Sequence, residues 1–314
     1  MRCLASIQQV SKLESIFGTD KVEKATVLGW TVIVKKNEFK INDKCVFITI
    51  DSVVPKTNAI FNFLASRNFT VKTIKLKNCI SQGLCLPLTY FVDLEKYKVG
   101  TDITTLLNIN CIKNTNVYEK HIQDIPEIIS EYKNKFVSCT EKLDGYNYIA
   151  TLKKRKFSLP FCKKYSFNYK CLDDFGITID NNIEKLLLNT IGENDSITLK
   201  GEICGPLIKG NKYYLKKPTL FIYDIEYKNK KVIKKLSQRN IKKFATKHNL
   251  RSVPFLGEFK LTKSIEDLVS LSKSENSKLN NHVKREGLII REARNNYAFS
   301  AKIMNPDFLL KYDM

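Results

Sequence analysis

The chain has 314 residues, 43% hydrophobic and 11% aromatic, which suffices for a sizeable core and for two domains of roughly 100 to 200 residues each. The formal net charge of +21 favours a polyanionic partner such as nucleic acid, although lysine is abundant even in the turns, so part of the excess is compositional. No apolar run approaches the roughly 18 residues of a membrane helix, and the polar N-terminus does not resemble a signal peptide. We therefore expect a monomer that acts inside a cell, cytoplasmic or nuclear, without a membrane partner.

Cysteine and histidine provide little evidence for a metal or redox site. The nine cysteines are scattered without a Cys-x-x-Cys pair, and the three histidines lie far apart in the sequence. The sequence therefore indicates neither a disulfide framework nor a zinc site.

The first hundred residues are expected to form short strands. Alternating or β-branched segments occupy residues 2–10, 24–36, 44–51, 68–77 and 79–86. Five short strands without a long amphipathic helix predict a small barrel such as an OB-fold, which commonly binds nucleic acid. Trp30, the only tryptophan, is either a core residue, as is commoner, or a platform on which a base stacks. We place this domain at residues 1–110 and expect short helices later in the chain at residues 125–132, 237–249 and 264–279.

The segment Lys142-Leu143-Asp144-Gly145 is the first candidate for chemistry. It lies between expected strands at 135–140 and 146–152, so we expect it in a loop that faces a cleft. The amine of Lys142 suits a nucleophile that attacks phosphorus, Asp144 suits a metal or ribose ligand, and Gly145 lets the backbone approach a phosphate. A motif this short also recurs by chance, and the alternative interpretation is a solvated turn.

Four later segments strengthen this interpretation by their order. They are a strand ending near Glu202, an aromatic strand containing Tyr223, a strand beginning with Glu286-Gly287, and a last basic strand carrying Lys302. With the lysine motif they resemble the covalent nucleotidyltransferases, which comprise RNA ligases, DNA ligases and mRNA capping enzymes.

The segments 25–30, 47–55 and 80–88 add a second resemblance, to the N-terminal OB domain of the Deinococcus and Naegleria type of RNA ligase. Together the two resemblances span nearly the whole chain. They imply an α+β protein in which an N-terminal OB-fold β-barrel precedes a nucleotidyltransferase (ATP-grasp-like ligase) domain at residues 111–314, built of antiparallel sheets with flanking helices.

The resemblance also implies roles for individual residues. Lys142 would take AMP from ATP, and Lys302 would contact the α-phosphate. An acidic ring would hold Mg²⁺ or Mn²⁺, partly through water, and consists of Asp144, Glu202 and Glu286. Gly145, Asn147 and Tyr223 would complete the nucleotide site, with Asn147 donating to the triphosphate and Tyr223 stacking on adenine. Phe221 has a core position as its alternative, and Asn147 a structural role beside the turn.

Two positions depart from the family pattern. The family's Cys-Ser-Arg-Asn is matched most closely by Cys162-Lys163-Lys164-Tyr165, so Lys164 would offer the 5′-phosphate a point charge in place of a two-pronged donor, or the segment is a solvated basic loop. Met304 stands where some relatives carry a second lysine, which leaves the α-phosphate chiefly to Lys302 and the metal.

The implied function is an ATP-dependent RNA ligase that seals a nick with an RNA 3′-OH strand through lysyl-AMP and an AMP-capped 5′ end. For the attack, the pKa of Lys142 must fall from about 10.4, and we expect the metal, Lys302 and desolvation to lower it. DNA ligases and capping guanylyltransferases use the same chemistry, but their OB domain typically follows the last basic strand, and only residues 303–314 follow Lys302. From a different class, an inactive nucleic-acid-binding OB protein is the further alternative.

Overall fold

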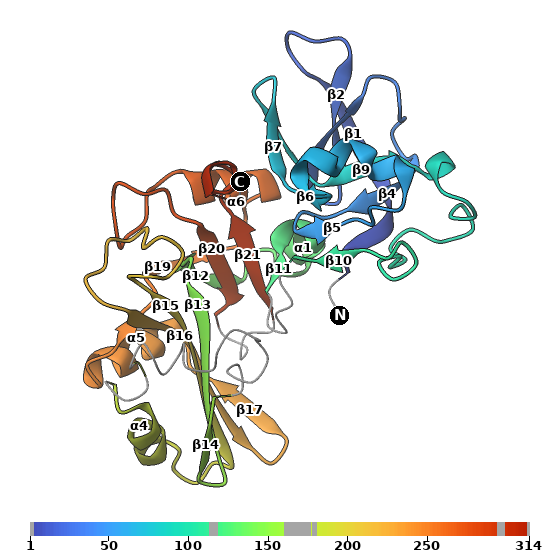
Figure 1. Cartoon of the computed structure of the whole chain (residues 1–314). Helices are drawn as coiled ribbons and strands as arrows, with labels where there is room; N and C mark the ends of the chain where they lie inside the picture. The colour runs from blue at the N-terminus through green and yellow to red at the C-terminus, as the bar shows by residue number, and fades with distance from the viewer. Residues whose placement is uncertain (1–2, 113–118, 160–176, 178–180, 294–298, 313–314) are drawn as a thin grey trace. The chain divides into compact units, whose positions relative to one another are not determined.

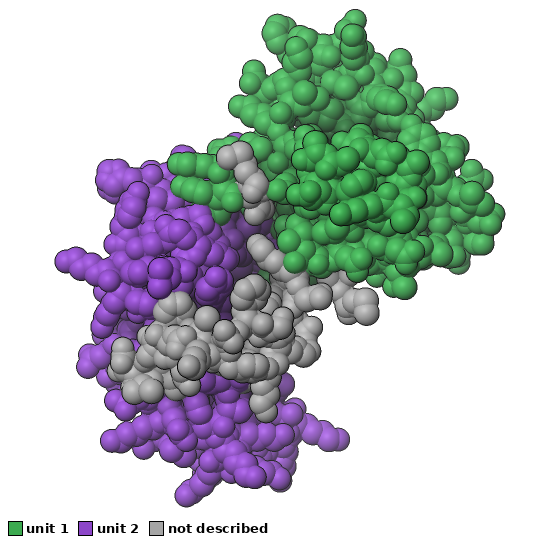
Figure 2. Space-filling view, in the orientation of Figure 1, with its two compact units in different colours: residues 1–131, 306–314 green, residues 132–305 purple. Residues whose placement is uncertain are grey.

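The structure is a computed structural model that describes residues 3–112, 119–159, 177, 181–293 and 299–312 (Figure 1). It divides into two compact units, unit 1 with residues 1–131 and 306–314 and unit 2 with residues 132–305 (Figure 2). The expected domain boundary after residue 110 remains a prediction. Across the described ranges, no helix is both long enough and apolar enough to cross a membrane.

Unit 1 is organised around one long strand, β1, which has two partners. Its first half pairs antiparallel with β4, and after an irregularity between Val10 and Lys12 its second half pairs with β2. A strand that bends at a bulge and changes partner curls a sheet into a barrel, so the expected N-terminal β-barrel is confirmed. The sheet order is β3-β2-β1-β4-β9. These strands are β1 (Ala5–Ser15), β2 (Val22–Val27), β3 (Trp30–Lys35), β4 (Lys44–Ile48) and β9 (Leu84–Pro87).

Smaller elements complete unit 1. Apolar side chains from them and from β1 and β4 share one buried cluster, which includes Ile7, Val46, Phe61 and Ile103. The small strands are β5 (Ser52–Val53), β6 (Thr70–Val71), β7 (Thr73–Leu76), β8 (Cys79–Gln82), β10 (Asn110–Cys111) and β11 (Lys120–His121). The helices are η1 (Ala59–Arg67), η2 (Leu88–Tyr90), η3 (Ile122–Asp124), α1 (Ile128–Glu131) and α7 (Pro306–Tyr312).

Two details of the expected barrel were wrong. The segment 24–36 is not one strand but the hairpin of β2 and β3, turning at Leu28-Gly29, where Leu28 has a φ of 54°. The turn lies within the apolar run Val27-Leu28-Gly29-Trp30, which has no polar turn residue, so the sequence pattern did not reveal it. Likewise the segments 68–77 and 79–86 are each divided into two short strands, the second at Gly83.

Unit 2 contains two sheets whose strands pair antiparallel, except that the short β18 pairs parallel with β16. The first has the order β21-β20-β12-β19 within this unit, and the second the order β14-β13-β15-β16-β17, with β18 beside β16. The first sheet contains β12 (Phe136–Lys142), β19 (Phe255–Lys260), β20 (Gly287–Glu292) and β21 (Ser300–Met304). The second contains β13 (Tyr146–Lys153), β14 (Lys156–Ser158), β15 (Ser196–Cys204), β16 (Thr219–Asn229), β17 (Val232–Lys235) and β18 (Arg251–Ser252).

Helices cover the second sheet. Ile183 and Leu187 of α4 (Ile183–Thr190) and Ile241 of α5 (Gln238–Lys247) share a buried cluster with residues of β13, β15 and β16. A third helix, α6 (Ile265–Lys273), begins at the expected Ser264 cap, where Ser264 and Asp267 form a capping box. It ends six residues before the expected end at 279, because the Ser- and Asn-rich sequence that follows favours turns.

The lysine motif connects the two sheets of unit 2. Strand β12 of the first sheet ends at Lys142 and β13 of the second begins at Tyr146, so only residues 143–145 join them. The expectation that Lys142 lies in the loop is therefore wrong, because it is the last residue of β12 and pairs with Gly287 of β20. A strand position fixes the lysine backbone more firmly than a loop would.

Candidate active site

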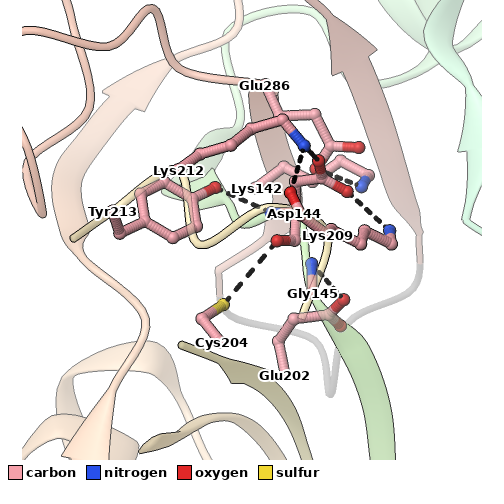
Figure 3. Close-up of polar contacts among 9 residues, drawn as sticks. All are labelled: Lys142, Asp144, Gly145, Glu202, Cys204, Lys209, Lys212, Tyr213 and Glu286. Atoms are coloured by element: carbon pink, nitrogen blue, oxygen red, sulfur yellow. Dashed lines mark hydrogen bonds and ion pairs between the residues drawn. The ribbon is translucent and has the colours of Figure 1, made fainter. Parts of the chain in front are cut away.

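Lys142 and Glu286 form the centre of the candidate site (Figure 3). Because Lys142 pairs with Gly287, the residue before Gly287, Glu286, lies beside the lysine, and Lys142 Nζ is 2.6 Å from Glu286 Oε2. The Lys142 side chain is 26% exposed and that of Glu286 is 10% exposed. The Lys142 side chain thus keeps some contact with solvent, while its partner is largely withdrawn from water.

Two glycines of the motifs are required by close approach of strands. A Cβ at Gly287 would overlap the carbonyl oxygen of Ile303 on β21, and a Cβ at Gly145 would overlap that of Ile203 on β15. Both positions lie next to a candidate site residue, and only glycine lets the backbones come this near.

Asp144 binds a loop that follows the Glu202 strand. Its Oδ1 is 2.5 Å from Lys209 Nζ, and its Oδ2 is 2.6 Å from Lys212 Nζ. Its backbone N–H donates to the hydroxyl of Tyr213 at 2.7 Å. These three partners come from residues 205–218, which connect β15 to β16 and which we name the lysine loop (Figure 3).

Glu202 occupies the facing strand of the second sheet. It pairs with Asn147 of β13, and its Oε1 accepts a hydrogen bond from the Gly145 N–H at 3.0 Å. Lys142, Asp144, Glu202 and Glu286, expected to act together, are therefore gathered at the connection between the two sheets (Figure 3).

Tyr223 and Asn147, which were singled out separately, are hydrogen-bonded to each other. The register of β15 and β16 shifts at Tyr223, from Lys200 opposite Asp224 to Gly201 opposite Ile222. The Tyr223 hydroxyl donates to Asn147 Oδ1 at 2.7 Å. The guanidinium of Arg291 lies 5.7 Å from the centroid of the Tyr223 ring and covers one face of it. Phe221 is only 1% exposed, so its core alternative holds and it is not available to a nucleotide.

The last basic strand presents Lys302 on the same sheet face as Lys142. Lys302 pairs with Ile289, and Met304, two residues on, pairs with Gly287, which itself faces Lys142. Residues that face each other across antiparallel strands point to the same side, as do residues two apart. Lys302 and Met304 are both buried. Lys164 lies outside the described residues.

Two family models match the chain. An OB-fold domain model matches residues 4–88, and an RNA ligase model matches residues 135–312, which is more than half of the chain. The chain belongs to the RNA ligase family. The resemblance inferred from the sequence is confirmed, and the family assignment makes the protein a ligase with a nucleic acid substrate. No curated protein sequence matches it.

Solved structures of Naegleria gruberi RNA ligase are similar over the whole length. An apo mutant has a TM-score of 0.86 at 24% identity and covers 100% of this chain and 99% of its own. The form with pyrophosphate has a TM-score of 0.85 at 24% identity and the same two coverages. A mutant with ATP and Mn has a TM-score of 0.87 at 24% identity and covers 100% of both chains. These likenesses confirm the fold of a ligase with an N-terminal OB domain.

The electrostatics of this RNA ligase hold Lys142 as a cation. Burial lowers the pKa of Lys142, but the carboxylates of Glu286, Glu202 and Asp144 together outweigh burial and raise that pKa above its ordinary value. Desolvation therefore acts on the pKa of Lys142 in the direction expected from the sequence, while the expected effects of the metal and of Lys302 remain predictions. The lysine needs a change in its surroundings before it can attack as a neutral amine.

The three carboxyl groups are not equivalent. Burial raises the pKa of Glu202 to about 7, although Lys142 and Lys209 act in the opposite direction. Burial also raises the pKa of Glu286. Burial would do the same at Asp144, but Lys209 and Lys212 outweigh it, and the pKa of Asp144 is lowered. Glu202 thus has a pKa near neutrality, whereas the pKa of Asp144 lies below its ordinary value.

The donor set suits a hard cation held largely through water. Its oxygen ligands are the type that Mg²⁺ and Mn²⁺ prefer. Across the described residues, no three side chains of His, Cys, Asp or Glu converge closely enough to hold one metal ion directly. Two of the candidate ligands form ion pairs with lysines in this structure: Asp144 with Lys209 and Lys212, and Glu286 with Lys142.

Sequence reasoning missed four residues of the site. Lys209, Lys212 and Tyr213 contact Asp144, and Arg291 covers Tyr223. The run of Lys, Gly and Asn directly after the Glu202 strand was a signal, but in a chain this rich in lysine it did not stand out.

Proposed function

We propose that this protein is an ATP-dependent RNA ligase that joins a 3′-OH to a 5′-phosphate through a lysyl-AMP intermediate. The observation that supports this most directly is a partly exposed lysine at the end of a strand, 2.6 Å from Glu286 and close to Asp144 and Glu202. Structures of the N. gruberi ligase with ATP and Mn, with AMP and Mn, and with pyrophosphate support the choice of nucleotide and cation.

In the first transfer, Lys142 Nζ attacks the α-phosphorus of ATP. A P–N bond forms, the bond between the α-phosphorus and the bridging oxygen breaks, and pyrophosphate leaves with that oxygen. Lys142 first has to lose its proton, while Glu286 keeps the nitrogen in place through their short contact. Positioning and electrostatics drive the step, since the described residues of the site offer carboxylates and lysines but no histidine.

Asp144, Glu202 and Glu286 would hold Mg²⁺ or Mn²⁺. When bound, the cation stabilises charge that develops on the phosphoryl oxygens and offsets the negative field that keeps Lys142 protonated. Lys302, on the same sheet face as Lys142, would contact the α-phosphate, and no second lysine at position 304 assists it.

The nucleoside would lie against Tyr223. Because Arg291 covers one face of the ring, the opposite face is the one that would stack on adenine. The Tyr223 hydroxyl engages Asn147 Oδ1, so the amide nitrogen of Asn147 is the end that would donate to a phosphate oxygen. Gly145 would let the backbone approach the nucleotide.

Two further transfers would follow. The AMP passes from Lys142 to the 5′-phosphate of the nucleic acid, and the 3′-OH then attacks that activated end and releases AMP. By family resemblance, Lys164 would contact the 5′-phosphate. A nicked duplex with an RNA 3′-OH strand is the proposed substrate, and the net charge of +21 supports binding to its backbone.

Label transfer tests this function. The protein and a Lys142→Ala variant are incubated with a divalent cation and either α-labelled ATP or α-labelled GTP, then separated by denaturing electrophoresis. We expect label from ATP on the unchanged protein only, and sealing of a nicked duplex that has an RNA 3′-OH strand. Label from GTP would favour a capping reaction. Absence of label from folded protein that carries no pre-bound AMP would rule out the proposed mechanism.

A further inference from the structure

The lysine loop brings more positive charge to Asp144 than the carboxylate needs. Lys209 takes Oδ1 and Lys212 takes Oδ2, so two ammonium groups share one negative charge. Lys212 Nζ also donates to the carbonyl of Lys209 at 2.9 Å, which ties the two lysines to each other. The pair therefore retains capacity for a more highly charged anion.

The position of the pair relates it to the nucleophile. Asp144 is two residues from Lys142, and the charges of Glu286 and Lys142 act on Lys209 strongly enough to influence its pKa. If the α-phosphorus of a triphosphate lies at Lys142, its outer phosphates lie a few ångströms farther along. That distance is within the range over which Lys142 and Glu286 interact with Lys209. Lys209 and Lys212 are the cations of the lysine loop that reach this point (Figure 3).

The backbone of the loop is suited to rearrangement. Four of its residues other than glycine lie in the left-handed region, which is unfavourable for residues that have a side chain. They are Leu207, Lys209, Asn211 and Tyr214, with φ values of 63°, 43°, 45° and 52°. Side-chain contacts hold this conformation, including both ends of the Asn211 amide on the Leu215 backbone. Such conformations persist only while contacts enforce them, so loss of the Asp144 contacts would favour movement.

There is room for the movement on one side of the loop. Tyr213 and Tyr214 line a cavity of 740 Å³ whose other wall is formed by residues 275–281. In that wall, Asn280 Nδ2 donates a hydrogen bond to the Lys212 carbonyl at 3.2 Å.

We infer that Lys209 and Lys212 are polyphosphate-binding residues, which exchange Asp144 for the outer phosphates of ATP and then for the leaving pyrophosphate. This inference rests on the proposed function. In the structure the two lysines neutralise Asp144. When Asp144 turns to the cation that accompanies ATP, the lysines lose their partner and the anionic phosphates replace it. When pyrophosphate departs, they return to Asp144.

The exchange makes the two lysines specific to one step. Pyrophosphate is present only while Lys142 takes or returns AMP, whereas sealing of RNA that already carries a 5′-AMP cap involves no outer phosphates. The two lysines should also affect the affinities of two ligands in opposite directions. They weaken binding of a cation, because they compete with it for Asp144, and they strengthen binding of a polyphosphate, because they attract it.

Calorimetric binding of simple probes provides a test that does not depend on turnover. The probes are Mn²⁺ alone, inorganic pyrophosphate in saturating Mg²⁺, and AMP. The variant is the double substitution Lys209→Ala and Lys212→Ala. The control is Lys216→Ala with Lys217→Ala, which removes the same charge from the same loop, at exposed residues that pair with no carboxylate in the described part of the chain.

We expect the double variant to bind pyrophosphate at least ~10-fold more weakly and Mn²⁺ several-fold more tightly, with AMP and the control within about twofold of the unchanged protein. Equal weakening of Mn²⁺ and pyrophosphate would mean that the loop only supports the site, and would overturn the inference. Unchanged pyrophosphate binding would do the same. If the double variant is unstable, Lys209→Gln with Lys212→Gln, which retains length and polarity, takes its place.

Kinetics separate this inference from the proposed function. We expect the double variant to be at least ~10-fold slower in forming lysyl-AMP and to seal pre-adenylylated RNA within about twofold of the unchanged protein. Equal loss in both reactions would overturn the inference. An unchanged protein that forms no lysyl-AMP would instead remove the proposed function.

Discussion

Lys142 Nζ and Glu286 Oε2 lie 2.6 Å apart, so the candidate nucleophile is held in place by a group that also keeps it protonated. Burial alone would favour the neutral amine, but Glu286, with Glu202 and Asp144, reverses the effect and raises the pKa of Lys142. These carboxylates therefore favour the protonated, non-nucleophilic form of the lysine. Reaction of Lys142 as a neutral amine then requires a group that offsets the negative charge of these carboxylates.

Replacing Glu286 by glutamine should separate these two effects. In Glu286→Gln without a divalent cation, the pKa of Lys142 falls, so at pH 8 acetylation of this lysine by acetic anhydride should be faster, by about tenfold for each unit of fall. Lysyl-AMP formation should instead drop by at least ~100-fold, because a proposed cation ligand is lost. Peptide mass spectrometry measures the first rate and label transfer the second. Glu226→Gln, which removes one carboxylate partner of Lys200 and Lys235 instead, serves as a control. Acetylation of Lys142 in Glu286→Gln that is no faster than in the unchanged protein would contradict this expectation.

Glu202 should make cation binding depend on pH near neutrality. Its pKa is raised to about 7 by burial, so it is mostly protonated below that pH and cannot serve a cation. Affinity for Mn²⁺ should therefore increase as pH rises toward 7, by up to about tenfold per unit, and level off above it. Calorimetry at pH 6, 7 and 8 measures this. In Glu202→Gln the affinity should be weaker and nearly constant, and a slope that persists would assign the titration to another group.

The hydrogen bond between Tyr223 and Asn147 predicts coupling between two residues that are 76 positions apart. If the hydroxyl orients the amide for a phosphate, Tyr223→Phe and Asn147→Ala each weaken ATP binding, and the double variant loses less than their sum. We expect a coupling free energy of roughly 0.5–1.5 kcal/mol. Titration of ATP into protein carrying Lys142→Ala, which blocks the reaction, measures the cycle. Strictly additive losses would show that the two residues act independently.

Strand order made the centre of the site predictable, and tertiary contacts made the rest unpredictable. Lys142, Glu202, Glu286 and Lys302 each lie in or beside a strand whose position in the sequence already indicated the family. Their convergence depends on register, such as Lys142 opposite Gly287, which one sequence does not show. The family resemblance supplied that information.

The lysine loop was missed because its relation to the site is a tertiary contact with Asp144, which no sequence pattern indicates. Lys209 and Lys212 resemble the many other lysines of the chain, and only the fold places them on Asp144. The turn at Leu28 was missed for a different reason, because it lies in a continuous apolar run without a polar turn residue. Lysine-rich composition and continuous apolar runs both reduce the local information on which sequence analysis depends.

The environment of Trp30 predicts that its fluorescence does not respond to RNA. Trp30 is 1% exposed, its Nε1–H donates to Asp124 at 2.7 Å, and its ring meets the edge of His121 with centroids 5.0 Å apart. These contacts support a core role and leave no ring face for a base. As the only tryptophan, it should emit at short wavelength, resist quenching by acrylamide, and keep its spectrum when single-stranded RNA is added.

Trp30→Phe should lower the free energy of unfolding by about 1–3 kcal/mol, because it leaves a void and removes the hydrogen bond to Asp124. It should leave RNA affinity within about twofold of that of the unchanged protein. Strong quenching by RNA, with a large loss of affinity in a folded Trp30→Phe variant, would instead place this residue at the nucleic acid surface.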